Sequence, residues 1–258
     1  MLGAIAGDII GSIHEFGPPA APGTPLIQEQ SHYTDDTVLT LATARCLLDG
    51  VDYARAYREA YRANRGQSWG LRFKQWGDNP DCGPYNSFGN GSAMRVSPIG
   101  FWARSLDEAL GEAQRSAAVT HDHPEGIRGA QATAHAILLA YMGATGEAIL
   151  ESVRNDHGYA LDESIPVIQR TSGYNETCQG TVPPAIRIAC EASSFEEVMR
   201  VCIGLDADTD TLACIAGGIA EARFGVPDWL REAVLDRLEP EQLDLLDRFS
   251  DAVAARGG

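Results

Sequence analysis

The chain has 258 residues and a formal net charge of −16. This length can bury the core of one large domain, and we expect a single domain over residues 1–258. The negative charge disfavours binding to nucleic acid or an anionic membrane surface, because the field of the protein repels a polyanion. Any phosphate-bearing ligand must therefore be held by local groups.

The opening of the chain, Met1 to Ile13, is apolar but does not fit an export signal or a membrane span. It contains Asp8, no Lys or Arg precedes Arg45, and the run is too short to cross a bilayer. The six cysteines form no CxxC pair and lie mostly in helical patterns, which is typical of reduced, buried thiols. We therefore expect a cytoplasmic protein with no membrane association.

Helical periodicity dominates the chain, and no run alternates convincingly between apolar and polar residues, so we expect a mainly α fold. Gly3, Gly7 and Gly11 form a small-residue stripe that indicates a buried first helix, packed closely against a neighbour. Later helices are predicted to start at a cap or a proline: at Thr34, at the capping boxes Ser105 to Glu108 and Ser194 to Glu197, and at Pro124 ahead of a run to Tyr141. Stretches rich in Gly, Pro and Asn predict loops over 14–32, 64–92 and 171–184.

Two acidic tetrads, Thr34-Asp35-Asp36-Thr37 and Asp208-Thr209-Asp210-Thr211, each open a long apolar run. N-capping accounts for one or two Thr or Asp residues per helix, because they satisfy free N–H groups and oppose the helix dipole. It does not account for carboxylates this dense, which repel one another unless a cation joins them. An oxygen-only ligand set suits Mg²⁺, Mn²⁺ or Ca²⁺ rather than zinc or copper. The tetrads therefore predict one shared metal site.

The segment Phe88-Gly89-Asn90-Gly91-Ser92-Ala93-Met94-Arg95 is a glycine-rich loop that runs into a predicted helix. Successive backbone N–H groups of such a loop can hold a diphosphate, which would offset the negative field of the protein. An Asn-Gly turn between two helices accounts for the same residues without a ligand. The pattern alone leaves both interpretations open.

Thr120-His121-Asp122-His123-Pro124 places two histidines just before a predicted helix. They could bind metal, as in the all-α His-Asp phosphohydrolases, but that class needs a further separated His and Asp around the same ions. The remaining histidines lie in no matching motif: His14, His32, His135 and His157. We therefore expect His121 to contact a ligand and His123 to be structural.

Together with Gly7-Asp8, with Gly11-Ser12 followed by Glu15, and with Ser172-Gly173-Tyr174, these motifs resemble the ADP-ribosylglycohydrolase family, which includes the dinitrogenase reductase-activating glycohydrolases. The motifs occur in the family's order and extend from Gly3 to Gly225. The resemblance implies a compact all-α single domain, an orthogonal helical bundle whose central cleft holds two Mg²⁺ or Mn²⁺ ions.

The resemblance also implies a role for each motif. The metal ligands would be Thr34, Asp35, Asp36, Asp208, Asp210 and Thr211. ADP-ribose would contact Phe88, Gly89, Asn90, Gly91, Ser92, Met94, His121 and Tyr174. The catalytic residues that move protons would be Glu15, beside the ribose, and Asp35.

The implied activity is hydrolysis of the C1″ glycosidic bond between ADP-ribose and an acceptor, with arginine favoured, on an ADP-ribosylated protein or small molecule. Alternatives are a serine, acetyl ester or nucleotide linkage, and a non-catalytic ADP-ribose-binding relative. We expect a monomer. In one departure, Asp206-Ala207 stands where the family usually has Gly-Gly before Asp-x-Asp-Thr, which puts the substrate in doubt more than the metal.

Overall fold

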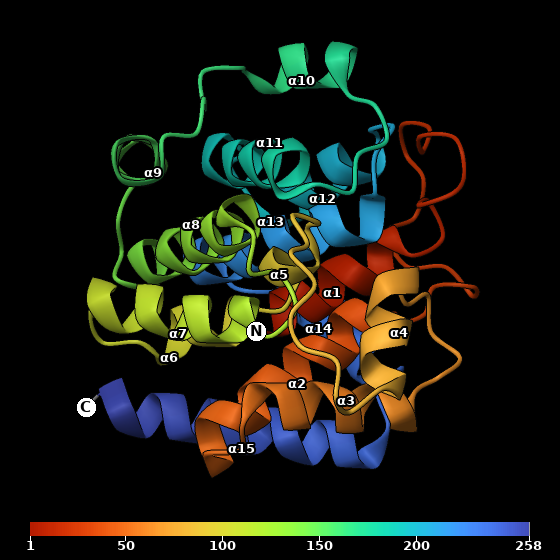
Figure 1. Cartoon of the computed structure of the whole chain (residues 1–258). Coiled ribbons are helices and arrows are strands. Elements are labelled where there is room, and N and C mark those ends of the chain that lie inside the picture. The colour runs from red at the N-terminus through yellow and green to blue at the C-terminus, as the bar shows by residue number, and fades with distance from the viewer. Residues whose placement is uncertain (258) are drawn as a thin grey trace.

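Helices α1 (Leu2–Gly11) and α13 (Thr209–Phe224) form an antiparallel pair at the centre of the computed structural model (Figure 1). Gly3, Gly7 and Gly11 lie against the α13 backbone, and a Cβ atom at any of them would collide with it. All residues of α1 are buried, so the prediction of a tightly packed buried helix is confirmed. The loop that follows α1 is thereby held beside the start of α13.

The structure describes residues 1–257, and within them the regular elements are helices, with no β-strand. The all-α prediction is confirmed, while the last residue of the predicted domain, 258, lies outside the described residues. The other helices are α2 (Asp35–Asp49), α3 (Tyr53–Ala63), α4 (Leu71–Asp78), α5 (Gly91–Met94), α6 (Ser97–Trp102), α7 (Leu106–Ala118), α8 (Pro124–Tyr141), α9 (Gly146–His157), α10 (Ile165–Thr171), α11 (Cys178–Glu191), α12 (Phe195–Ile203), α14 (Asp228–Leu235) and α15 (Pro240–Gly257).

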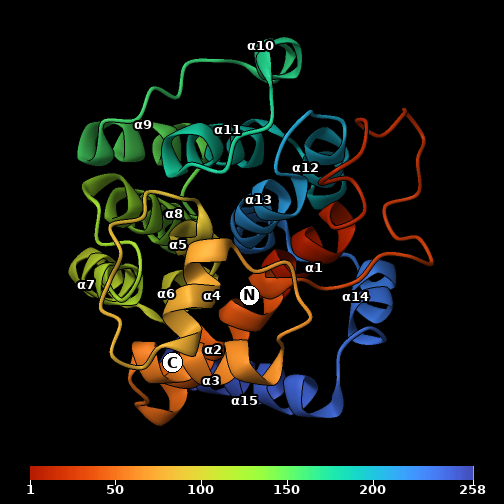
Figure 2. The ribbon, with the colours of Figure 1, turned by 45° about the vertical axis from the view of Figure 1, so that its right-hand side comes forward.

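The helices stack around the central pair, with α10 at one end of the molecule and α15 at the other (Figures 1 and 2). Helices α11 and α12 cover one side of α13, α9 lies beside α11 and α8, and α2, α3 and α15 lie beyond α1 (Figure 2). One hydrophobic cluster runs from Met1 to Val253, as expected of a single compact domain. None of the helices in residues 1–257 has the length and apolar character needed to cross a membrane.

The predicted helix starts are confirmed. The side chains of Thr34, Ser105 and Ser194 cap α2, α7 and α12, accepting hydrogen bonds of 3.1–3.3 Å from backbone N–H groups. Helix α8 begins at Pro124 and ends at Tyr141, as the sequence predicted. The loop predicted over 14–32 is also confirmed, because no helix begins between α1 and α2.

The loop predicted over 64–92 was wrong in its middle, where α4 forms. The glycine and asparagine content of this stretch suggested a loop, but Trp69, Phe73 and Trp76 are buried and pack against Tyr61 of α3 and against one another. The Trp69 and Phe73 rings stack at a centroid distance of 5.1 Å. This aromatic packing fixes α4 over the site described below.

The loop predicted over 171–184 was wrong in its second half, because α11 begins at Cys178. Thr177 caps the helix by accepting from the Gly180 N–H at 3.1 Å. Pro183 and Pro184 suggested a break, yet both lie inside α11. They leave two carbonyl groups of its first turn without the usual helical donor.

Candidate active site

A cleft of about 310 Å³ opens where the loop after α1, the start of α2, α4, the glycine-rich loop and the start of α13 meet. It gathers motifs that are far apart in the sequence. Six carboxylate side chains line it: Glu176 and five others, here called the acidic group, which are Glu15, Asp35, Asp36, Asp208 and Asp210. Thr211, Gly89, Asn90, Gly91, Met94, His121 and Tyr174 from the predicted site also line it.

Asp8, a fully buried carboxylate on α1, organises the start of α2. It accepts hydrogen bonds from the backbone N–H groups of Thr34 and Thr37, both at 3.0 Å, and from their hydroxyls at 2.8 and 2.5 Å. The first acidic tetrad is therefore pinned to the central helix. Asp8 was missing from the predicted site, although a single acidic residue in an apolar helix was a signal.

Thr34 lies behind the acidic group and does not line the cleft. Its hydroxyl donates to Asp8 and accepts from the Asp36 N–H at 3.3 Å. This arrangement suits a residue that positions the carboxylates of α2. Its role as a metal ligand stays a prediction.

The acidic group has the chemistry of a divalent cation site. Single carboxylate oxygens of Glu15, Asp208 and Asp210 all lie within 4.8 Å of one another. Asp36 has a buried Oδ1 with no hydrogen-bond partner. No ion pair to Lys, Arg or His joins any member of the group within the described residues. Buried carboxylates without a counter-charge fit hard cations such as Mg²⁺ or Mn²⁺.

Burial and mutual repulsion raise the pKa of every carboxyl in the acidic group. The pKa of Glu15 rises to about 8, mainly through burial, with further contributions from the charges of Asp208 and Asp35. The pKa of Asp35 rises to about 7, again mainly through burial and then through Asp8. Burial is also the main cause of the raised pKa values of Asp36, Asp208 and Asp210. A bound cation would favour the charged forms and reverse these shifts.

The glycine-rich loop is fixed by Asn90. Its backbone N–H donates to the Glu176 carbonyl at 2.8 Å. Its Nδ2 donates to Asp208 Oδ2 at 2.7 Å and to Thr181 Oγ1 at 3.0 Å. Asn90 therefore orients a carboxylate of the acidic group as well as shaping the cleft wall.

Phe88 and Ser92, both predicted to contact ADP-ribose, do not line the cleft. Ser92 is fully buried, and its hydroxyl donates to the Gly126 carbonyl at 2.7 Å. Phe88 lies outside, with its ring 5.3 Å from that of His123. Ser92 thus supports the loop from behind.

Two arginines and a histidine, here called the basic group, line the cleft beyond the glycine-rich loop: Arg72, Arg95 and His121. Arg95 is fully buried, and its Nη2 donates to the Ser116 carbonyl at 2.7 Å and to Thr120 Oγ1 at 3.0 Å. Its Nη1 is buried without a partner. Sequence reasoning missed both arginines: Arg72 carried no signal inside a predicted loop, and Arg95 stood at the end of the glycine-rich motif without a role.

His121 is neutral in this environment. Burial lowers its pKa well below the ordinary value of 6.5, and the charges of Arg95 and Arg72 lower it further. Its Nδ1 lies 2.7 Å from Thr120 Oγ1, while a Cβ atom placed at Gly91 would lie 3.3 Å from its Nε2. Nε2 therefore faces the glycine-rich loop, as a ligand-contacting nitrogen must.

His123 is the N-cap of α8, where its Nδ1 accepts from the Glu125 N–H at 3.1 Å. The candidate metal group found among residues 1–257 contains no histidine. His135 and His157 instead pair with each other at 3.1 Å. The phosphohydrolase alternative thus gains no support.

Tyr174 closes the cleft beside Glu15. Its ring lies 6.4 Å from that of Phe16, and its hydroxyl donates to Glu176 Oε1 at 2.7 Å. Phe16 lies on the loop after α1, and Tyr174 and Glu176 lie on the loop before α11. This contact joins the two segments that flank the acidic group.

A family model described as ADP-ribosylglycohydrolase matches residues 1–257. The chain belongs to the ADP-ribosylglycohydrolase family. It is 28% identical to mouse ADP-ribosylhydrolase ARH3 in an alignment of 307 positions, gaps included, which covers 88% of this chain and 83% of that protein. It is 26% identical to ADP-ribosylarginine hydrolase Tri1 from Pseudomonas putida, with 96% of this chain and 77% of that one covered.

A solved structure described as an ADP-ribosylglycohydrolase-related protein complex matches the fold with a TM-score of 0.75 and 25% identity, covering 98% of this chain and 94% of that one. The resemblance of the motifs to this family is therefore confirmed, as is the compact all-α fold. Family membership and the named relatives identify this protein as a glycosyl hydrolase of ADP-ribosylated substrates.

Proposed function

We propose that this hydrolase uses two divalent cations, Mg²⁺ or Mn²⁺, to cleave the C1″ glycosidic bond between ADP-ribose and an arginine acceptor, releasing ADP-ribose. The observation that carries the proposal is the acidic group, in which three buried and two half-buried carboxylates crowd together and none forms an ion pair within residues 1–257. We assign the metal ligands as Thr34, Asp35, Asp36, Asp208, Asp210 and Thr211. Glu15 belongs to the same group by distance, so it lies close enough to act on a metal-held ribose.

When bound, the cations would supply Lewis acidity and a water of lowered pKa, at the carbon where oxocarbenium-like charge develops. The protein's own task is then to hold the ribose and move protons. Glu15 and Asp35 are the proposed proton carriers, since both carboxyls line the cleft. A general acid or base must lie within hydrogen-bond reach of the proton that it moves.

The two charged groups of the cleft suggest how ADP-ribose lies in it. We propose that the distal ribose sits at the acidic group and that the diphosphate sits across Gly89, Asn90 and Gly91, towards the basic group. Backbone N–H groups and arginines are the usual partners of phosphate oxygens. With a net charge of −16, the protein as a whole repels a diphosphate, so the ligand has to be held by local positive groups such as these.

Arginine is the proposed acceptor, and an ADP-ribosylated protein or small molecule the proposed substrate. The relative from Pseudomonas putida is named for ADP-ribosylarginine, whereas the name of the mouse relative specifies no acceptor. A serine, acetyl ester or nucleotide linkage is the alternative for the same site. We further propose a monomer in the cytoplasm, where the free cysteines of the chain would stay reduced.

The proposal is tested by measuring release of free ADP-ribose from ADP-ribosyl-arginine and ADP-ribosyl-serine substrates, with Mg²⁺ or Mn²⁺ and again with chelator. We expect release from the arginine substrate that chelator abolishes. Release from the serine substrate alone would identify the other linkage. Release that chelator leaves unchanged would contradict the metal requirement.

A further inference from the structure

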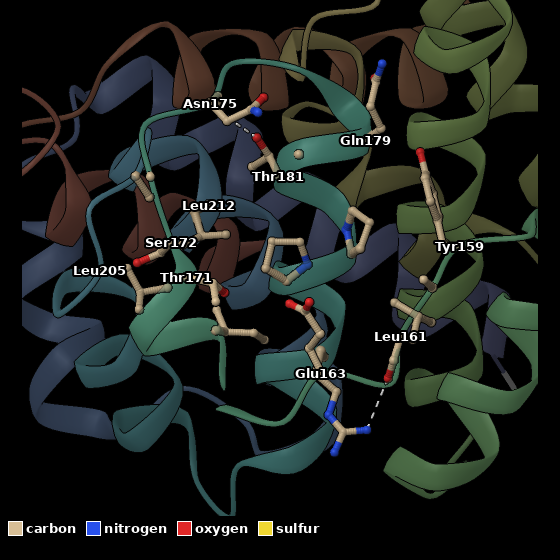
Figure 3. A pocket seen from close by; sticks show the side chains of 18 of the residues that line it. Tyr159, Leu161, Glu163, Thr171, Ser172, Asn175, Gln179, Thr181, Leu205 and Leu212 are labelled. Carbon is tan, nitrogen blue, oxygen red and sulfur yellow. Dashed lines mark hydrogen bonds between the residues drawn. The ribbon is translucent and has the colours of Figure 1, made fainter. Parts of the chain in front are cut away.

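A second cavity, of about 490 Å³, lies beneath α10. Its roof is the α10 strap, defined here as residues 158–175, and its floor is the start of α11. Figure 3 shows Tyr159 and Leu161 on one side of this pocket and Ser172 and Leu205 on the other. Asp208 lines both this cavity and the catalytic cleft, so the two hollows are neighbours at the start of α13.

The floor of the cavity is rich in hydrogen-bond acceptors. Pro183 and Pro184 line it and have no N–H to donate, so the α-helical bonds to the carbonyls of Gln179 and Gly180 are missing. Tyr159, which is only 4% exposed, has a buried hydroxyl without a hydrogen-bond partner. A ligand that donates several hydrogen bonds would satisfy these groups.

The unpaired charge of the cavity is negative. Two arginines line it, but Arg128 is paired with Glu125 at 2.5 Å and Arg187 with Glu191 at 2.6 Å. The acidic side chains that line it, Glu163, Asp206 and Asp208, form no ion pair within residues 1–257. The cavity therefore favours a cation that is also a hydrogen-bond donor.

We propose that this cavity receives the acceptor side of the substrate and that Asp206 selects a guanidinium group there. The inference rests on the proposed function, since it takes C1″ to lie at the acidic group. Asp206 is exposed, lines the cavity and stands two residues before Asp208, which also lines the catalytic cleft. A guanidinium carries a charge and a fork of donors, whereas a serine linkage offers neither.

The first test compares Asp206→Asn, which removes the charge and keeps the size, with the wild-type protein on arginine-linked and serine-linked substrates. The matched control is Asp251→Asn, an exposed change on α15 at the other end of the molecule (Figure 1). We expect Asp206→Asn to lower kcat/KM for the arginine substrate by about fivefold, as for a partly exposed charge pair, and to spare the serine substrate. The control should change neither value. An equal effect on both substrates, or no effect on either, would overturn the inference.

The second test does not depend on turnover. Agmatine, a small guanidinium compound, is titrated into the wild-type protein and both variants, and its binding is followed by ligand-observed NMR. Weaker binding to Asp206→Asn than to wild type or Asp251→Asn supports the inference, and equal binding to all three overturns it. If the wild-type protein hydrolysed neither substrate, the proposed function would fail while agmatine binding still decided the role of the cavity.

Discussion

The acidic and basic groups share one cleft, and they differ in how much charge of one sign each of them buries. In the basic group only Arg95 buries a charge, because Arg72 is exposed and the pKa of His121 is lowered, and the Arg95 guanidinium donates to Ser116 and Thr120. The acidic group crowds five carboxyls together, three of them buried, and none of the five forms an ion pair within residues 1–257. Uncompensated buried charge is unfavourable without a ligand. The comparison supports the proposal that the acidic group binds a cation.

The largest effect is expected where that cation would bind. Asp208→Ala removes a carboxylate that lies within 4.8 Å of Glu15 and Asp210 and accepts from Asn90. We expect metal affinity and hydrolysis to fall together, by more than the roughly 10- to 100-fold typical of residues that only support a ligand. Mn²⁺ titration and initial rates provide the two measurements. Full activity with normal metal binding would show that Asp208 is not part of the site.

Glu15→Gln separates proton transfer from binding on the acidic side. The substitution keeps the size of the side chain and removes its ability to carry a proton. We expect turnover to fall by about 10²- to 10⁴-fold, the usual contribution of a general acid or base, with ADP-ribose affinity retained. Unchanged turnover would exclude Glu15 from proton transfer. A matching loss of Mn²⁺ affinity would instead identify it as a metal ligand.

Arg72→Gln addresses the basic group. Arg72 is exposed on α4 and lines the cleft, so its loss should weaken a phosphate contact without disturbing the core. We expect the Kd for ADP to rise roughly tenfold, as for a hydrogen bond to a charged group, with Mn²⁺ binding unchanged. Arg231→Gln, an exposed change on α14, is the control. Equal ADP affinity in Arg72→Gln and the control would remove Arg72 from the phosphate site.

A further expected effect is on the pH dependence of stability. A carboxyl whose pKa is raised by folding holds its proton more tightly in the native state, so its favourable contribution is present at low pH and lost as the pH rises. For Glu15 this loss extends from its ordinary pKa of 4.5 to about 8. The metal-free protein should therefore lose stability across this range, and Mg²⁺ should raise Tm more at its upper end.

The matched variant for the pH experiment is Glu15→Gln. In the metal-free protein, Tm should fall less steeply with pH in this variant than in the wild type. Thermal unfolding in chelator and in Mg²⁺ gives all the required values. A metal-free Tm that rises with pH, or a Mg²⁺ effect that is the same at both ends of the range, would contradict the pKa assignments.

The sequence predicted the parts of the fold and site that depend on local chemistry. Thr34 and Asp208 flank helix starts where capping patterns placed them, and the glycine stripe marked the central pair. Helix α4 was not predicted because the burial of Trp69 and Phe73, which stabilises it, occurs only when the two side chains pack on α3. That packing is a tertiary event, which local composition does not encode.

The same distinction applies to the site. Carboxylate density identified the four aspartates of the acidic group, since carboxylates this close in sequence repel one another unless a cation joins them, whereas Glu15 was assigned only through the family resemblance. The basic group depends on where α4 and the buried Arg95 come to rest, and no local pattern marks that position. Asp8 falls between the two cases: its charge in an apolar helix was visible, but its four hydrogen bonds to the start of α2 required the fold.

Separate titrations of Mn²⁺ and ADP into the wild-type protein, Asp208→Ala and Arg72→Gln test most directly that one cleft has a cation-binding side and a phosphate-binding side. The account predicts that Asp208→Ala loses Mn²⁺ and keeps ADP, while Arg72→Gln keeps Mn²⁺ and loses ADP affinity. If both variants lost both ligands equally, or if neither lost either, the division of the cleft into an acidic and a basic group would be contradicted.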